Sequence, residues 1–172
     1  MVNFKQILAL DPSGNFKEGK GTTGFCLLDT RTKTATVWEI KATDYKSTEE
    51  YWTAITDCVA DVRQHNKSLV VVIEDYILYE SKAQNQINSL LETPRLIGIL
   101  QWYCYNNKIP YYLEFASAVK NRWTNKILAY KGYITITSSG ITTLHGEKIS
   151  KHCVDAVRHA VNYNTFVNVK KK

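Results

Sequence analysis

Three acidic residues lie far apart in the sequence but occupy places from which they could act together. Asp11 ends the apolar run "LAL", Glu74 ends the run "VVVI", and Asp155 lies in a predicted C-terminal helix, "KHCVDAVRHA". A strand that ends in an acid carries it to the edge of the sheet, where open α/β sheets bind ligands. Acids that converge there repel one another unless a cation neutralises them, which predicts a divalent-metal site with oxygen ligands. Taken singly, each acid is more simply explained as the solvent-exposed end of its element.

The strands that must position these acids follow from the hydrophobic pattern. Apolar or alternating runs predict strands at residues 6–10, 24–28, 34–40, 69–74 and 109–115. The first three follow one another closely, which predicts an antiparallel meander. The fourth is a continuous β-branched run, typical of a central strand that is covered on both faces.

Helices are predicted between and after these strands. Ser47 and Glu50 have the spacing of a capping box, and apolar residues recur behind them at helical intervals. Further helices are predicted at 83–106, 117–130 and 147–162. Pro94 interrupts the first of these, which predicts two helices or one kinked helix, and 132–146 is predicted as strand or loop. This order of elements predicts a mixed sheet with helices packed on it.

Length, charge and cysteine content limit the class of protein. A chain of 172 residues is typical of a single domain with a sizeable core. Its 22 lysines and arginines outnumber 16 acids, and residues 168–172 form a basic tail that we expect to be flexible. A basic balance favours a polyanionic partner, but it is also common in soluble domains without one. The four cysteines form no CxxC pair and the N-terminal apolar stretch is too short for a signal peptide or membrane span, which predicts a cytoplasmic protein with reduced thiols.

Four motifs in a fixed order, "LALDPSGN", "TTGFCLLD", "VVVIEDY" and "HCVDAVRHA", resemble the RuvC-type Holliday-junction resolvases. More loosely they resemble the whole RNase H-like nuclease superfamily. The segments "ETPRLIGIL" and "ASAVK" match the family as well, and its compact phage-encoded members look most similar. The resemblance implies one RNase H-like α/β domain over residues 1–172. Its mixed five-stranded sheet would have three antiparallel strands and then parallel strands, flanked by helices.

The resemblance also implies a catalytic site and a reaction. Asp11, Glu74, His152 and Asp155 would be the catalytic residues and the metal ligands, binding two Mg²⁺ ions for which Mn²⁺ can substitute. The reaction would be hydrolytic nicking of four-way or other branched DNA. His152 stands where the family commonly has an acid, and its simpler interpretation is a polar surface position. Asp75 should point to the opposite face of its strand from Glu74 and is not expected to be a ligand.

DNA contacts and a dimer are implied in the same way. A four-way junction presents two equivalent strands, which suits a two-fold dimer, and the family is dimeric. The segment "ILQWYCYNN" could face such a partner or the sheet. Lysines near the site would neutralise phosphates and tyrosines after the fourth strand would stack on unpaired bases, although surface lysines are usually only solubilising. The residues expected to contact DNA are Lys82, Lys120, Lys126, Tyr76 and Tyr79.

Two further features extend or depart from the family pattern. The insertion "NFKEGKG" at residues 15–21 adds Lys17 and Lys20, which either contact phosphate or lie in a solvated loop. In the last helix, Arg158 could contact a phosphate, whereas His159 is expected to be structural or at the surface.

Other classes of protein are alternatives to a junction nuclease. The actin-like and sugar-kinase ATPases share an aspartate on the first strand, but they need a second domain for which this chain is too short. A DNA-binding module without catalysis conflicts with the intact set of three acids. A broader flap or branched-DNA endonuclease of the same fold is the strongest alternative.

Overall fold

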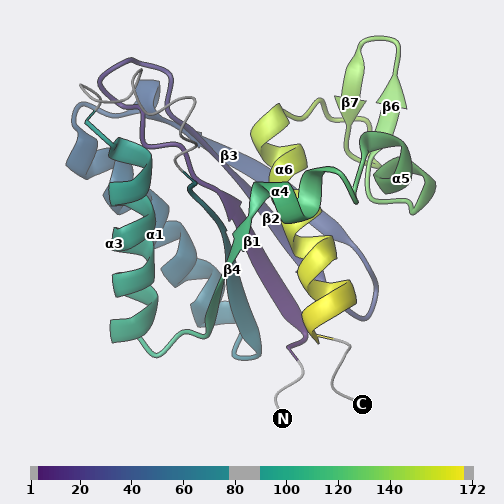
Figure 1. The fold of residues 1–172 in the computed structure, drawn as a ribbon, viewed down its shortest axis with the longest axis horizontal. Coiled ribbons are helices and arrows are strands. Elements are labelled where there is room, and N and C mark those ends of the chain that lie inside the picture. The colour runs from purple at the N-terminus through teal and green to yellow at the C-terminus, as the bar shows by residue number, and fades with distance from the viewer. Residues whose placement is uncertain (1–3, 78–89, 169–172) are drawn as a thin grey trace.

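A five-stranded sheet forms the centre of the computed structural model, which describes residues 4–77 and 90–168 (Figure 1). The strand order is β3-β2-β1-β4-β5. The first three strands are antiparallel neighbours, while β4 and β5 continue the sheet in parallel with β1. The strands are β1 (Gln6–Asp11), β2 (Thr22–Asp29), β3 (Ala35–Lys41), β4 (Leu69–Asp75) and β5 (Tyr111–Phe115). The predicted mixed sheet, with three antiparallel strands and then parallel strands, is confirmed.

Alternate residues of the central strands enter two separate cores. On β1, Ile7 and Ala9 belong to the core on one face of the sheet, and Leu8 and Leu10 to the core on the other. The same division separates alternate residues of β4. Both faces of these strands are therefore apolar and covered, as expected for a central strand in an α/β sheet.

Helices cover the sheet on both faces (Figure 1). Two of them, α1 (Thr48–His65) and α3 (Glu92–Asn106), lie on the face that receives Leu8 and Leu10. On the other face lie α4 (Ala116–Lys120) and α6 (Lys151–Tyr163), followed by the short helical segment η2 (Asn164–Asn168). A short 3₁₀ helix, η1 (Ala42–Asp44), precedes α1.

The predicted capping box begins α1. The hydroxyl of Ser47 accepts a hydrogen bond from the Glu50 backbone N–H at 3.1 Å, and the Glu50 carboxylate accepts one from the Lys46 N–H at 3.0 Å. The first bond satisfies a donor that the first turn of a helix leaves unpaired, and the second ties the residue before the cap to that turn.

The boundaries of three predicted helices need correction. The described part of the 83–106 stretch is α3, which starts at Glu92, so Pro94 lies in its first turn where its missing N–H costs little. The predicted 117–130 helix is two helices, because Thr124 caps a new helix, α5 (Asn125–Tyr130). The last helix begins at Lys151 rather than 147, because Ser150 accepts a hydrogen bond from the Cys153 N–H and caps it.

The stretch predicted as strand or loop forms a hairpin. Its strands, β6 (Thr135–Thr137) and β7 (Gly140–Thr142), pair with each other and make a separate two-stranded sheet. Figure 1 shows this hairpin and α5 extending outward beside α6, on the opposite side of the molecule from α1 and α3. Across the described ranges, no helix has the length and apolar character needed to cross a membrane.

Candidate metal centre

Asp11, Glu74 and Asp155 come together at one end of the sheet. On β1 and β4, Asp11 and Glu74 continue the alternation of the residues that face α6, and Asp155 lies on that helix. One carboxylate oxygen from each residue lies within 4.8 Å of those of the other two. The side chains of Asp155 and Glu74 are only 2% and 15% exposed, so the negative charges are concentrated in a largely dry place.

A glycine lets α6 come this close to the sheet. Gly24 on β2 pairs with Asp11 on β1, and the first turn of α6 lies directly on it. A Cβ atom at residue 24 would stand 2.3 Å from the carbonyl carbon of His152. Any other residue would force the helix away from β2, and Asp155 would move with it.

The turn after Asp11 is held by a buried tyrosine. The hydroxyl of Tyr51 donates to the carbonyl oxygen of Ser13 at 2.8 Å and lies 3.0 Å from the Thr23 hydroxyl, which accepts the Ser13 N–H at 3.3 Å. Burial raises the pKa of Tyr51 to about 12, which keeps the hydroxyl protonated and able to donate. The backbone that carries Asp11 is therefore fixed from α1 and β2 together.

Two cations contact the acids. The ammonium of Lys120, at the end of α4, lies 3.3 Å from Oε1 of Glu74 and 3.1 Å from Oδ2 of Asp155. Burial alone would lower the pKa of Lys120, but the charges of the two carboxylates outweigh it and raise the pKa. The guanidinium of Arg158 pairs with Asp155 and also donates to the carbonyl oxygen of Trp123 at 2.9 Å. Arg158 is thus an internal partner of Asp155 and does not offer its charge to a phosphate at the surface.

A buried histidine joins Glu74 to a fourth acid. His159 is fully buried, and its Nε2 lies 2.9 Å from Glu74 while its Nδ1 lies 2.8 Å from Glu114. Although burial lowers the pKa of His159, hydrogen bonds and charge from Glu114 and Glu74 outweigh it and raise the pKa to about 9. Glu114 also accepts a hydrogen bond from the amide of Asn162 at 2.6 Å. His159 is structural, as expected, and it lies in the core.

The surroundings of Asp11 and Glu74 shift the pKa values of these two acids in opposite directions. Burial raises the pKa of Asp11, and the negative charges of Glu74 and Asp155 act in the same direction, whereas the hydrogen bond and charge of His152 offset only part of the rise. Burial acts on Glu74 in the same direction, but its hydrogen bond to His159 and the charges of His159 and Lys120 outweigh it and hold its pKa below the usual range. A bound cation would therefore favour the ionised form of Asp11 more than that of Glu74.

His152 lies at the rim of the cluster. Its Nδ1 donates to Oδ2 of Asp11 at 2.7 Å, and its side chain is 37% exposed. This hydrogen bond is the main reason that the pKa of His152 is raised, with burial acting against it. Asp75, next to Glu74, shares the alternation of the residues on the α1 and α3 face, and its carboxylate accepts the Tyr76 N–H at 2.8 Å.

The expected DNA contacts are spread over the molecule. Lys120 lies within the acidic cluster, whereas Lys126 is exposed on α5. Tyr76 is half-buried and packs against the core under α1 and α3. Lys82 and Tyr79 lie outside the described residues. In the 15–21 insertion, Lys20 forms an exposed ion pair with Glu18 at 3.7 Å.

The partnership of His159 and Glu114 is the part of the site that the sequence alone did not indicate. Glu114 lies opposite Glu74 in the parallel register of β4 and β5, and His159 lies one helical turn after Asp155. A glutamate on the strand next to Glu74 and a histidine four residues after the helical acid were the available signals. Neither one identifies its partner without the pairing of the strands and the packing of α6.

Comparison with solved structures identifies the fold. Thermus thermophilus RuvC superposes with a TM-score of 0.65 at 13% sequence identity, over 96% of each chain. T. thermophilus RuvC in complex with a Holliday junction substrate superposes with a TM-score of 0.63 at 15% identity, over 95% of this chain and 96% of that one. The protein has the RuvC, RNase H-like fold. The sequence matches no protein-family model and no curated protein, and the phage origin that the resemblance suggested finds no support.

Proposed function

We propose that this protein is a metal-dependent endodeoxyribonuclease that nicks branched DNA, with the four-way junction as its preferred substrate. The observation that carries the proposal is the convergence of Asp11, Glu74 and Asp155 within 4.8 Å at the edge of a RuvC-like sheet. Hard carboxylate oxygens are the ligands that Mg²⁺ prefers, so the donor set fits a divalent ion. A RuvC of this fold has been solved with a Holliday junction substrate, which supports the choice of substrate.

Each residue of the cluster has a role in this proposal. As the resemblance to the resolvases implies, Asp11 would hold both of two Mg²⁺ ions, with Glu74 and Asp155 holding one each. Such a pair of ions supplies an activated water and stabilises the departing 3′ oxygen in an in-line hydrolysis. His152 adds a fourth ligand on the exposed side of Asp11, and Mn²⁺ would also be accepted. Lys120 pairs with Glu74 and Asp155, and in this proposal it would also contact a substrate phosphate.

A homodimer is part of the proposal, because a four-way junction has two equivalent strands to cut. The α1 and α3 face supports it. Trp102 is 65% exposed and Tyr105 73% exposed on α3, whereas Cys104 between them is buried. The segment "ILQWYCYNN" therefore presents one side to the sheet and another to the outside.

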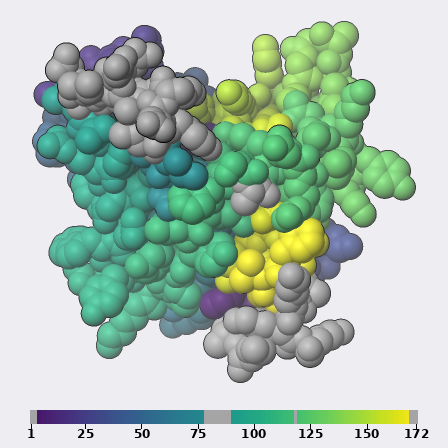
Figure 2. All heavy atoms as spheres, viewed as in Figure 1, coloured from purple at the N-terminus to yellow at the C-terminus, as the bar shows by residue number. Residues whose placement is uncertain are grey.

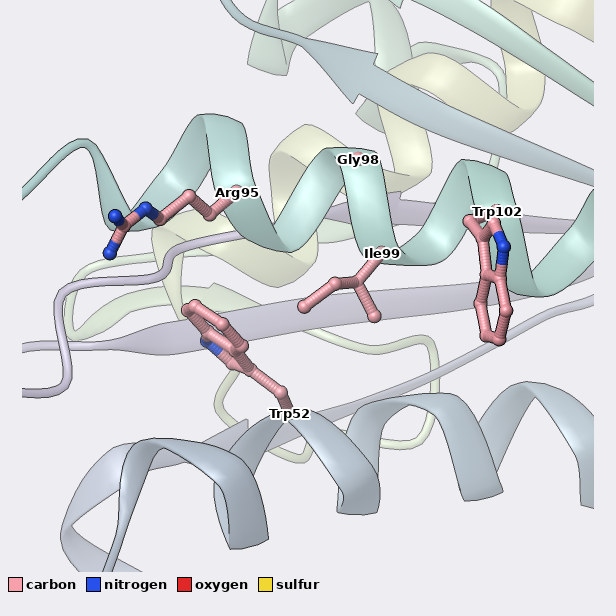
Figure 3. A pocket seen from close by; sticks show the side chains of 5 residues that line it. All are labelled: Trp52, Arg95, Gly98, Ile99 and Trp102. Atoms are coloured by element: carbon pink, nitrogen blue, oxygen red, sulfur yellow. The ribbon is translucent and has the colours of Figure 1, made fainter.

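A hollow beside Trp102 adds to this argument. Trp52, Arg95, Gly98, Ile99 and Trp102 line a cavity of about 390 Å³ between α1 and α3 (Figure 3). The indole N–H of Trp52 is buried and has no acceptor among the described residues. A second copy of the chain seated here would cover the exposed ring of Trp102.

The test is a nicking assay with a synthetic four-way junction beside matched duplex, flap and single-stranded DNA, with Mg²⁺ and with EDTA. We expect Mg²⁺-dependent cuts in the junction in preference to the other substrates. Equal cutting of the duplex would mean a nonspecific nuclease, and preferential cutting of the flap would mean a flap endonuclease. Binding without cutting would mean a DNA-binding module without catalysis.

Variants of the acids test the site itself. Asp11→Asn, Glu74→Gln and Asp155→Asn should each abolish nicking while junction binding in EDTA remains, because each removes a metal ligand and no phosphate contact. Asp61→Asn, an exposed acid on α1, is the matched control and should keep full activity. Nicking that survives in the Glu74 variant would contradict the assignment of the site.

A further inference from the structure

The net positive charge of the chain is concentrated in one segment. From Lys120 to Lys151 there are six lysines and arginines and a single acid, Glu147, a net charge of +5 out of +6 for the whole protein. The remaining residues sum to +1, which includes the three lysines of the C-terminal tail. A general excess of surface lysine would be spread along the chain, so this distribution indicates a local polyanion-binding surface.

The segment forms an arm whose two ends meet at the candidate metal centre. The arm comprises residues 121–150, with α5 and the β6–β7 hairpin, and it begins directly after Lys120 and ends directly before Lys151 and His152. Lys120 contacts Glu74 and Asp155, and His152 contacts Asp11. Figure 2 shows the light green atoms of the arm projecting from the body of the molecule. DNA that enters the site would therefore pass beside the arm.

The base of the arm is anchored in the core. Leu128 and Ile134 are buried in the cluster that also contains residues of α6. Trp123 is buried with them, and its indole N–H donates to Asn162 on α6 at 2.9 Å. The arm is thus held in a defined position relative to the acids, as a binding surface beside a catalytic site must be.

The outer part of the arm carries positive charges that no acid of the protein neutralises. Lys126, Lys131, Lys148 and Lys151 are exposed, and none of them forms an ion pair with a described residue. Elsewhere Lys20, Arg31 and Lys41 each pair with a nearby acid, whereas exposed lysines such as Lys5 and Lys67 are as unpaired as those of the arm. Unpaired ammonium groups on an ordered support are the groups that displace counterions from DNA phosphates.

The shape and chemistry of the hairpin fit a duplex. A two-stranded β-ribbon fits the major groove of B-DNA, and serine and threonine hydroxyls contact phosphate oxygens as lysines do. The hairpin from residue 135 to residue 142 reads "TITSSGIT" and has no arginine, asparagine or glutamine, the side chains that most often read base edges. The outer surface of the hairpin therefore suits contacts with the DNA backbone that do not depend on base sequence.

We propose that the arm of residues 121–150, with Lys151, grips a duplex arm of the branched substrate through its phosphates, next to the metal centre. This inference rests on the proposed function and adds a second DNA surface to it. Lys131 follows α5 and Lys148 lies beside Gly140 of the hairpin, 3.7 Å from where a Cβ of residue 140 would stand. Two separate parts of the arm would thus each contact the backbone.

The experiment measures the salt dependence of junction binding in EDTA, where cleavage does not occur. The double variant Lys131→Gln/Lys148→Gln removes two charges from the arm, and Lys5→Gln/Lys67→Gln removes two exposed charges at the opposite end of β1 and β4. Each lost phosphate contact should reduce the slope of log K against log salt by about 0.9. We expect the arm variant to lower the slope by about two. Its affinity for junctions of unrelated sequence should fall by one common factor, while the control variant leaves both the slope and the affinity unchanged.

The outcomes separate this inference from the proposed function. If the wild-type protein nicks junctions but both double variants keep its salt slope, the arm does not bind DNA and only this inference is overturned. If the wild-type protein neither binds nor nicks any DNA, the proposed function is overturned with it. If the arm variant changes the sedimentation of the protein but not the salt slope, the arm is a protein-binding surface and the inference is wrong.

Discussion

At the scale of single residues, Glu74 is held between two cations of different kinds. Lys120 approaches it from the open side of the cluster and His159 from the core. His159 in turn contacts Glu114, so two carboxylates share one buried imidazole. Removing one partner of such a buried arrangement leaves an uncompensated charge and typically costs about 3–5 kcal/mol. The position of Glu74 therefore depends on His159 and Glu114, which lie on the core side of the metal centre.

The raised pKa of His159 predicts how stability changes with pH. An imidazole with a pKa of about 9 in the folded protein and about 6.5 in the unfolded chain stabilises the fold fully below pH 6.5. That stabilisation, on the order of 3 kcal/mol, is lost as the pH rises through 9. Urea unfolding of the metal-free protein from pH 6 to 10 should show this decrease.

Two variants isolate the contribution of His159. In Glu114→Gln the imidazole loses one charged partner and its pKa in the folded protein falls, so the decrease should still begin near pH 6.5 but be smaller and end at lower pH. In His159→Gln this contribution should be absent, leaving a flatter profile than that of the wild-type protein. If the free energies of unfolding of the wild-type protein and His159→Gln differ by the same amount at every pH, His159 does not titrate in this range.

His152 predicts the choice of metal. Imidazole is a better ligand for Mn²⁺ than for Mg²⁺, which prefers oxygen, and only the neutral imidazole binds a metal. His152→Asp should therefore raise the ratio of Mg²⁺-supported to Mn²⁺-supported nicking. His152→Ala should lower both rates roughly tenfold, the lower end of the range for residues beside a metal, and less than Asp11→Asn does. The rates are compared at fixed pH; an unchanged ratio together with full activity of the alanine variant would make His152 a surface residue.

At the scale of elements, the contact between α6 and β2 decides whether the acids meet. Ser150 caps the helix directly above β2, and Gly24 provides the space for its first turn. On the opposite side, Tyr51 of α1 holds the turn that follows Asp11. The centre is therefore supported from both faces of the sheet.

Gly24→Ala should destabilise the fold by about 3 kcal/mol and reduce nicking strongly. The new methyl group would collide with the backbone of His152 rather than with a flexible side chain, so the helix must move. The control is Gly98→Ala on α3, where a Cβ meets nothing within 4 Å and the loss of a helical glycine should stabilise the fold by about 0.5–1 kcal/mol. Urea unfolding at low concentration measures both; equal stabilities would show that α6 does not depend on Gly24.

At the scale of the whole molecule, the two sides of the sheet differ in chemistry. The segment from Lys120 to Lys151 on the α6 side carries +5 of the net charge of +6, whereas the α1 and α3 side exposes Trp102, which lines a cavity, and Tyr105. A molecule with this division can bind DNA on one side and a second copy of itself on the other without competition between the two.

The protein should sediment as a dimer at micromolar concentration. Trp102→Glu places a charge in the exposed aromatic surface and should shift the equilibrium towards monomer by tenfold or more, since about 1.4 kcal/mol suffices for tenfold. Leu144→Glu, an exposed apolar residue of the arm, is the control and should leave the dimer intact. A wild-type protein that is monomeric both alone and on DNA would contradict the dimer and favour a flap nuclease.

Much of this protein is determined by local sequence. The five strands and the capping box of α1 were predictable because apolar runs, period-two alternation and the Ser47–Glu50 spacing are short-range patterns. The three acids could be proposed as a group because Asp11 and Glu74 end buried strands, and the end of a strand in an α/β sheet is a defined place.

Only the tertiary structure decided the rest, because it depends on contacts between distant residues. Trp123 packs against α6, and the stretch predicted as one helix divides there into α4 and α5. His159 lies 85 residues from Glu74 and 45 from Glu114 along the chain, and no local pattern encodes that pairing. Arg158 pairs with Asp155 within the same helix, but its hydrogen bond to the carbonyl oxygen of Trp123, 35 residues away, forms only because α6 packs there. Local periodicity determines which elements form, whereas the packing of α6 on the sheet determines which side chains meet.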